Sequence, residues 1–243
     1  MAQPFPQNPE PVDFGMIRPS TVPDHADRER GVGHRANRVA KRLIDIVVAG
    51  LMLLLLSPVM VVIALMIRLT SPGRALFQQV RIGQSQSPFV MLKFRSMHQG
   101  FDDAIHRAYV TSMLIERAAP ADAKPGIYKL TSDPRVTSIG KFLRKTSLDE
   151  MPQLVNVLRG EMSLVGPRPV LPWEAELFEP RHQVRFAVQP GITGLWQVTG
   201  RSALTMQQAL DLDVEYVRRR GMLLDLAILL RTIPTVLLSR GAY

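Results

Sequence analysis

Two adjacent carboxylates, Asp149 and Glu150, form the strongest candidate site of chemistry in this chain of 243 residues. They follow Arg144 and Lys145 and stand just before Pro152. Neighbouring positions on a helix point about 100° apart, so the two carboxylates must have different roles. An aspartate can attack phosphorus to form an acyl phosphate when Mg²⁺ or basic side chains neutralise the phosphate charge. The segment therefore offers a nucleophile, a second carboxylate that moves a proton or orients a metal, and cations for phosphate.

The same segment also fits a purely structural explanation. Ser147 and Glu150 have the spacing of a capping box at a helix N-terminus, where Asp149 would interact favourably with the helix dipole. The local sequence alone favours this explanation, although it places Pro152 inside the first turns, where proline disturbs a helix. A helix that starts at Asp149 removes the conflict and makes Asp149 the cap. Capping and catalysis both stay open on these grounds.

Basic residues elsewhere offer phosphate contacts. Arg168 lies between two prolines that hold it extended, so its planar fork can be aimed at little entropic cost. Arg201 follows the glycine turns of residues 190–200. Taken singly, each segment is more simply a connector, and Lys93 more simply belongs to the polar face of a strand.

An apolar run over residues 46–67 indicates a membrane element. At about 1.5 Å per residue its length is close to the ~30 Å hydrocarbon core of a bilayer. Pro58 cannot donate to the carbonyl of Leu54, so we expect a kink there, with the Ser57 hydroxyl bonding back to the preceding turn. Basic residues flank both ends and tend to stay cytoplasmic. A re-entrant helix satisfies both flanks and a crossing satisfies one, and the segment alone does not decide between them.

The composition limits the function classes. A net charge of +9 and a pI near 10.4 indicate anionic partners: phospholipids, nucleic acid or phosphorylated small molecules. No helix-turn-helix, zinc-finger or RNA-binding signature is present, so nucleic acid is not the expected partner. The absence of cysteine excludes disulfides, thiol nucleophiles and cysteine zinc sites. A hydrophobic content of 46% suits one membrane element with one globular domain rather than a multi-span transporter.

The chain divides into three expected regions. Residues 1–33 are rich in proline, which predicts a disordered tail without a cleaved signal peptide. Residues 34–72 are expected to form the membrane element. Residues 73–243 are expected to form the catalytic domain. The expected fold is α+β and mainly helical, with a β-hairpin formed by residues 75–82 and 89–97. Helices are expected over residues 102–118, 137–145, 148–160, 204–219 and 223–238. The last helix should pack on the domain or lie at the membrane surface.

Six motifs, in order, resemble one known family. They are K-R-L-I-D-I before the run with its central S-P, L-K-F-R-S-M at 92–97, S-L-D-E at 147–150, L-V-G-P-R-P at 164–169, P-G-I-T-G-L-W-Q-V at 190–198 and L-D-V-E-Y at 212–216. Over about residues 38–243 the chain resembles the bacterial sugar transferases, the monotopic phosphoglycosyl transferases that start exopolysaccharide and glycan assembly on polyprenyl phosphate. The order of the motifs makes the resemblance specific.

The resemblance implies an activity and residue roles. A sugar-1-phosphate would pass from a UDP-sugar to undecaprenyl (polyprenyl) phosphate, releasing UMP, with Mg²⁺ as cofactor. Asp149 would be the nucleophile that holds a covalent phosphosugar, as well as a metal ligand, and Glu150 would assist proton transfer or activate the acceptor. Asp213 would have a supporting or metal-linked role. The implied phosphate contacts are Lys93, Arg144, Arg168 and Arg201.

The resemblance also implies a location. The family's anchor is a re-entrant helix broken at Ser57-Pro58, which favours the hairpin and a catalytic domain with interfacial amphipathic helices on the cytoplasmic face of the bacterial inner membrane. Gln189 departs from the family pattern, in which a basic residue is common, and Arg185 is a candidate replacement. The C-terminal S-R-G-A-Y favours galactose or glucose as the sugar.

Several alternatives stay open. An inert scaffold at the membrane surface would also explain the basic charge and the capping box. Within enzymes, the lipid phosphate could attack directly in a ternary complex. The oligomeric state, including a homo-oligomer, is not determined by the sequence.

Overall fold

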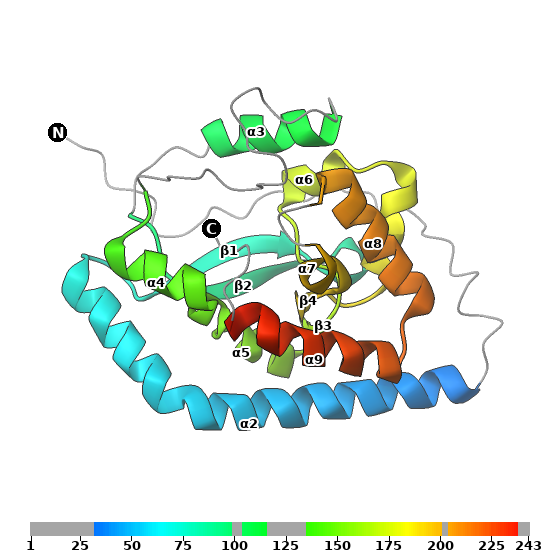
Figure 1. Ribbon diagram of the computed structural model, residues 1–243, viewed down its shortest axis with the longest axis horizontal. Coiled ribbons are helices and arrows are strands. Elements are labelled where there is room, and N and C mark those ends of the chain that lie inside the picture. Colours follow the sequence, from blue (N-terminus) through cyan, green and yellow to red (C-terminus); the bar gives the residue numbers. More distant parts are fainter. Residues whose placement is uncertain (1–31, 99–103, 116–134, 201–203, 238–243) are drawn as a thin grey trace.

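A long helix runs along one side of a body made of short helices and two small sheets (Figure 1). The computed structural model describes residues 32–98, 104–115, 135–200 and 204–237. The predicted N-terminal tail, up to residue 31, and Arg201 lie outside these ranges. Within them the chain is mainly helical with a minor strand content, as the sequence predicts.

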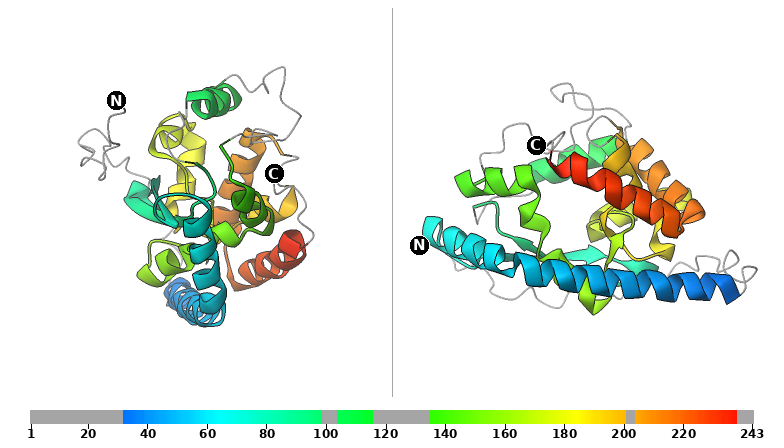
Figure 2. Two further views of the ribbon diagram at one scale, coloured as in Figure 1. Left: turned by 90° about the vertical axis from the view of Figure 1, so that its left-hand side faces the viewer. Right: turned by 60° about the horizontal axis from the view of Figure 1, so that its bottom comes forward.

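The long helix is α2 (Val32–Thr70), which continues through Pro58. Its ribbon changes direction between the blue and cyan parts (Figures 1 and 2). The Ser57 hydroxyl donates to the Leu54 carbonyl at 2.9 Å, which serves the acceptor that Pro58 leaves unpaired. This predicted hydrogen bond is confirmed, and it explains why the helix bends without ending. The structure thus has one bent helix, and its re-entrant placement stays a prediction.

By length and composition, the part of α2 over Asn37–Thr70 could cross a membrane. Few of its apolar side chains are covered by the rest of the protein. The exposed ones include Leu51, Leu54, Leu55, Val62, Leu65 and Leu69.

Two strands, β1 (Leu76–Ile82) and β2 (Pro88–Phe94), pair antiparallel as predicted. The short 3-10 turn η1 (Gln84–Gln86) joins them. A second sheet consists of β3 (Ser163–Val165) and β4 (Gly191–Thr193), which pair in parallel. The first sheet delivers Lys93 to the site described below, and the second leads into the segment that carries Arg168.

The other helices are short. They are α3 (Ala104–Ile115), α4 (Ser138–Thr146), η2 (Leu148–Glu150), α5 (Gln153–Arg159), α6 (Pro172–Glu176), η3 (Pro180–Ala187), α7 (Leu195–Thr199), α8 (Met206–Arg219) and α9 (Met222–Leu237). The predicted ranges agree with α3, α4, α8 and α9 to within a few residues. The prediction of one helix over 148–160 is wrong, because a 3-10 turn and the separate helix α5 occupy this range.

The largest core joins β2, α5, β3, α8 and α9 to the inner face of α2. Its buried members include Ala49, Met91, Leu154, Val165, Tyr216 and Ile228. Because Ala49 belongs to α2, one face of the first half of the long helix packs into this core. The second half packs on a separate cluster through Ile63 and Ile67, and the other faces of the helix are exposed along its length.

Polar contacts reinforce this packing. Oδ1 of Asp45 accepts the Leu164 N–H at 3.1 Å, and Nζ of Lys41 donates to the Val165 carbonyl at 3.1 Å. Lys41 also pairs with the buried Asp225 of α9 at 2.7 Å, and Asp225 accepts a 2.8 Å hydrogen bond from the Tyr216 hydroxyl. The K-R-L-I-D-I motif therefore attaches α2 to strand β3.

Candidate active site

Asp149 and Glu150 lie on η2, a single turn between α4 and α5. Ser147 has a left-handed backbone (φ 58°), ends α4 and makes no capping hydrogen bond with its side chain. Helix α5 begins only after Pro152, where the missing N–H of proline costs no helical hydrogen bond. The capping-box explanation is therefore wrong, because the left-handed residue turns the chain and directs Glu150 elsewhere.

Glu150 binds two cations from distant parts of the chain. Its Oε1 accepts hydrogen bonds from Nζ of Lys93 at 2.9 Å and from Nη2 of Arg168 at 2.8 Å. Burial raises the pKa of Glu150, but the charges of Arg168 and Lys93 and their hydrogen bonds outweigh burial and hold that pKa well below its usual value. Glu150 is thus ionised at neutral pH and keeps both cations on one oxygen.

The pKa values of Lys93 and Arg168 also depend on this environment. Burial lowers the pKa of Lys93, and the attraction of Glu150 partly restores it. The charge of Glu150 raises the pKa of Arg168. A lysine from β2 and an arginine from the loop after β3 thus converge on the turn η2. Converging cations of this kind suit a phosphate ligand, because a bound phosphate can take over hydrogen bonds that a carboxylate accepts in its absence.

Asp149 lies in the same electrostatic environment. Its carboxylate interacts with the charges of both Lys93 and Arg168, and the residue is 8% exposed. The predicted nucleophile is therefore next to the two predicted phosphate-binding cations. Asp149 is therefore largely shielded from bulk solvent.

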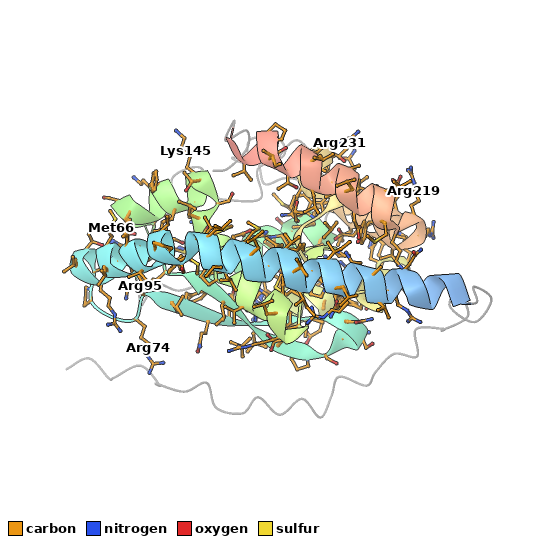
Figure 3. The ribbon with its side chains drawn as sticks, turned by 90° about the horizontal axis from the view of Figure 1, so that it is seen from below. Met66, Arg74, Arg95, Lys145, Arg219 and Arg231 are labelled. Atoms are coloured by element: carbon orange, nitrogen blue, oxygen red, sulfur yellow. The ribbon has the colours of Figure 1, made fainter. Side chains whose placement is uncertain are left out.

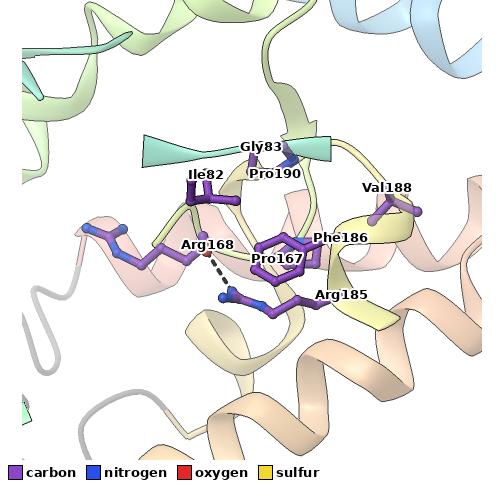
Figure 4. Close-up of a pocket in the computed structure, with 8 residues that line it drawn as sticks. All are labelled: Ile82, Gly83, Pro167, Arg168, Arg185, Phe186, Val188 and Pro190. Carbon is purple, nitrogen blue, oxygen red and sulfur yellow. Dashed lines mark hydrogen bonds between the residues drawn. The ribbon is translucent and has the colours of Figure 1, made fainter. Parts of the chain in front are cut away.

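A buried ion pair supports Arg168 from behind. Nη2 of Arg185 lies 2.7 Å from Oδ2 of Asp213 and donates to the Arg168 carbonyl at 2.6 Å. Figure 4 shows this second bond, with the Arg168 side chain directed away from Arg185. Burial raises the pKa of Asp213 to about 6, against the opposing attraction of Arg185. Asp213 thus contacts Arg185, which also holds the Arg168 carbonyl, and its supporting or metal-linked role stays a prediction.

Arg185 is the candidate replacement for the basic residue that is absent at Gln189, and this role stays a prediction. Its side chain is buried against Phe178 and Phe186 and lines the small pocket of Figure 4. Gln189 donates to the carbonyl of Gly160, so it serves the end of α5. In this structure both side chains donate to backbone carbonyls, Arg185 to that of Arg168 and Gln189 to that of Gly160.

The other two predicted phosphate contacts are Arg144 and Arg201. Arg144 is half-buried on α4, and its guanidinium has no hydrogen bond to another described residue. Arg201 lies outside the described residues. The residues that the structure brings together are thus Asp149, Glu150, Lys93 and Arg168.

Sequence reasoning missed Arg81, which it considered only as a basic flank of the membrane run. Arg81 of β1 lies 3.7 Å from Glu174 and donates to the Pro169 carbonyl at 3.4 Å. Burial lowers its pKa to about 10, and the nearby charge of Arg168 acts in the same direction. The available signal was its position near the end of a strand that pairs with the strand of Lys93.

The donor set fits Mg²⁺ held jointly by protein and substrate. Mg²⁺ sites of phosphoryl-transfer enzymes commonly use one or two carboxylates plus substrate phosphates and water. Across the described ranges, no group of three acidic, histidine or cysteine side chains forms a cage for a metal. Glu150 already pairs with two cations, and the role of Asp149 as a Mg²⁺ ligand stays a prediction.

Comparison with known proteins identifies the family of this chain. The family model described as bacterial sugar transferase matches residues 36–239, which includes η2, both cations and most of α2. The chain belongs to the bacterial sugar transferase family. This sugar transferase is 38% identical over 226 residues to the exopolysaccharide production protein ExoY of Rhizobium meliloti (strain 1021). The aligned region covers 93% of the chain and 98% of that relative.

Two further relatives have names that state a substrate. The sugar transferase is 39% identical over 211 residues to the UDP-glucose:undecaprenyl-phosphate glucose-1-phosphate transferase of Caulobacter vibrioides. The aligned region covers 84% of the chain and 72% of that relative. It is 37% identical over 216 residues to the undecaprenyl-phosphate galactose phosphotransferase of Salmonella typhimurium, which covers 88% of the chain. The chain spans 44% of the length of this last relative.

Proposed function

We propose that this sugar transferase moves a hexose-1-phosphate, galactose or glucose, from a UDP-sugar to undecaprenyl phosphate and releases UMP, as the first membrane step of exopolysaccharide assembly. The observation that carries the proposal is the placement of the buried Asp149 beside two cations that share one oxygen of Glu150. The relatives named for UDP-glucose and for galactose transfer support the same chemistry.

Asp149 is proposed as the nucleophile of a two-step transfer. A carboxylate oxygen of Asp149 bonds to the sugar-bearing phosphorus while the bond from that phosphorus to the bridging oxygen breaks, and UMP leaves with that oxygen. A phosphate oxygen of the lipid then attacks the same phosphorus, and Asp149 is released as a carboxylate. Each step forms one P–O bond and breaks one, so the chain returns to its starting state.

Lys93 and Arg168 are proposed to stabilise the charge that develops on the transferred phosphate. Preorganised cations in a site that excludes water contribute strongly to transition-state stability. When the diphosphate binds, both cations can exchange Glu150 for phosphate oxygens. The pKa of Glu150 then rises, because the charges that lowered it are shared with the substrate, and Glu150 becomes suited to accept a proton from the lipid phosphate.

Asp149 is also the proposed carboxylate contact for Mg²⁺. The ion, when bound with the substrate, would neutralise charge on the diphosphate. Lys93 and Arg168 supply two fixed positive charges in the same place, so the protein itself would neutralise part of the phosphate charge.

The protein is proposed to lie at the bacterial inner membrane with its site on the cytoplasmic face. Helix α9 exposes one apolar stripe, and α9 and α2 lie on the same side of the molecule (Figure 3 and the left view of Figure 2). The basic residues Lys145, Arg219 and Arg231 point outward along this side (Figure 3). An apolar face bordered by basic side chains suits an interface with anionic lipid. The exposed stripe of α9 consists of Leu223, Leu226, Leu230 and Ile233.

Two measurements test the proposal. Asp149→Asn should abolish UMP release from UDP-galactose or UDP-glucose while membrane association and thermal unfolding stay near wild type, because the amide keeps the shape and loses the nucleophile. Turnover by this variant would contradict the nucleophile assignment.

Wild-type protein incubated with radiolabelled UDP-sugar and Mg²⁺, without lipid, should retain labelled phosphosugar. Turnover with no retained label would favour direct attack in a ternary complex, and absence of turnover with every UDP-sugar would favour the scaffold.

A further inference from the structure

Asn156 of α5 bonds to strand β2 beside the site. Asn156 is fully buried, and its Oδ1 accepts the Leu92 N–H at 3.0 Å while its Nδ2 donates to the Val90 carbonyl at 2.7 Å. Among the described residues β2 pairs in its sheet with β1 alone, so these two backbone groups lie on the edge of β2 that faces away from β1. The amide therefore satisfies an N–H and a C=O as a neighbouring strand would.

A third contact fixes the amide itself. Nδ2 of Asn156 also donates to Oε2 of Glu161 at 2.7 Å. With both Nδ2 hydrogens and Oδ1 engaged, the side chain has a single orientation, and an aspartate in its place would lose two donated bonds and face the charge of Glu161. The side chain thus behaves as a rigid link between α5 and β2.

The link joins the two halves of the candidate site. Lys93 follows Leu92 directly, and Asn156 lies on the helix that begins just after Asp149 and Glu150. We infer that Asn156 is a positioning residue that holds the Lys93 ammonium against Glu150 and beside Asp149. The inference concerns the position of Lys93, and it rests on the proposed function only for its kinetic consequence.

The first test measures the position of Lys93 without using activity. Pulse acetylation of the full-length protein in detergent, read by mass spectrometry, reports the access of reagent to each lysine. Lys93 should be protected in the wild type, and Asn156→Ala should increase its labelling several-fold without changing that of the exposed Lys145. Unchanged labelling of Lys93 in Asn156→Ala would overturn the inference.

A matched variant separates positioning from general loss of stability. Thr232→Val removes a 2.8 Å hydrogen bond between Thr232 and Thr193, away from β2. It should lower the melting temperature and leave the labelling of Lys93 unchanged. If Thr232→Val exposes Lys93 as strongly as Asn156→Ala does, the effect is a general one and the inference is wrong.

The second test is a double-mutant cycle with Lys93. Asn156→Ala should lower kcat/KM for UMP release about 10- to 100-fold, since small displacements of a positioning group cost this much. In a Lys93→Ala background the same change should have an effect of less than about twofold, because the group it positions is gone. Equal losses in both backgrounds would overturn the inference. If Lys93→Ala releases no UMP, the cycle is measured on the affinity for UMP instead. A wild type without turnover would contradict the proposed function and leave the labelling test in force.

Discussion

Arg168 donates a 2.8 Å hydrogen bond to Oε1 of Glu150 across 18 positions of the sequence. The bond closes the loop after β3 onto the turn that carries Asp149. Arg168 is thereby oriented before any substrate is present, and its backbone is held independently by Arg185. Such preorganisation reduces the entropy that must be lost when a phosphate binds.

We expect Glu150→Gln to lower kcat/KM for UMP release by about 10²-fold or more, a typical loss for a proton-transfer group. The neutral amide binds Lys93 and Arg168 more weakly, so we also expect the free energy of unfolding to fall by about 1–3 kcal/mol. Steady-state UMP release and thermal unfolding in detergent measure the two effects. Glu215→Gln is the control, because it breaks an exposed pair with Arg219 and should change both by little. Wild-type rates in Glu150→Gln would argue against the assignment.

The ion pairs of Glu150 with Lys93 and Arg168 predict how the free energy of unfolding depends on pH in acid. The pKa of Glu150 in the folded protein lies below its unfolded value of about 4.5, so its stabilisation is present above that pH and is lost as pH falls through the folded pKa. The wild type should therefore lose more stability below pH 4.5 than Glu150→Gln does. Parallel pH–stability curves for the two proteins would contradict this.

Asp213 should produce an acid limb in the pH profile of activity. Its pKa of about 6 means that it becomes neutral below this pH, and Arg185 then loses the charge that orients it against the Arg168 carbonyl. We expect UMP release to fall as pH decreases through about 6, and Asp213→Asn to be slower and to lack this limb. Asp211→Asn, on the same helix, should keep it. A limb that survives in Asp213→Asn would assign it to another group.

The stability effect of Asp213 has the opposite sign to that of Glu150. Between pH 3.8 and about 6 the folded protein binds this proton and the unfolded chain does not, so this group alone makes the free energy of unfolding rise as pH falls. Comparing melting temperatures of wild type and Asp213→Asn over this range isolates the contribution.

A charge on the exposed stripe of α9 should weaken membrane binding. Leu230 is 59% exposed on that stripe, and Leu230→Glu adds a charge that is costly to bury in lipid. Flotation with vesicles that contain anionic lipid should show less bound protein than wild type. Ser87→Glu adds the same charge at the exposed turn between β1 and β2 and should bind as wild type. Equal binding of all three proteins would mean that α9 faces water.

The re-entrant placement of α2 predicts that both ends of the chain are on the cytoplasmic side. In intact spheroplasts, impermeant labelling reagents should reach neither an N-terminal nor a C-terminal cysteine tag, and both should react after lysis. Labelling of the N-terminal tag before lysis would show that α2 crosses the membrane.

Local patterns in the sequence predicted much of the fold. Short extended segments around a polar turn indicated β1 and β2, and the ranges expected for α3, α4, α8 and α9 agree with the structure to within a few residues. The Ser57 hydrogen bond followed from the chemistry of proline alone. These elements were predictable because short-range spacing determines them.

Features that depend on the whole fold were not predictable in the same way. The left-handed backbone of Ser147 is uncommon for serine, and the local sequence did not indicate it, so the capping box looked more favourable than it is. The parallel pairing of β3 with β4 and the roles of Arg81 and Asn156 depend on contacts between residues far apart in sequence. The roles of Asp149, Glu150, Lys93 and Arg168 came from resemblance, and the structure adds their proximity.

The bonds from Lys41 and Asp45 to strand β3 have a practical consequence for anyone preparing this protein. Removing the apolar helix α2 to obtain a water-soluble fragment would also delete part of the protein core and the support for the backbone that precedes Arg168. A fragment that begins after α2 is therefore a poor choice for crystallisation or inhibitor screening. A shortened protein should keep the chain at least from Lys41 and be handled in detergent or nanodiscs.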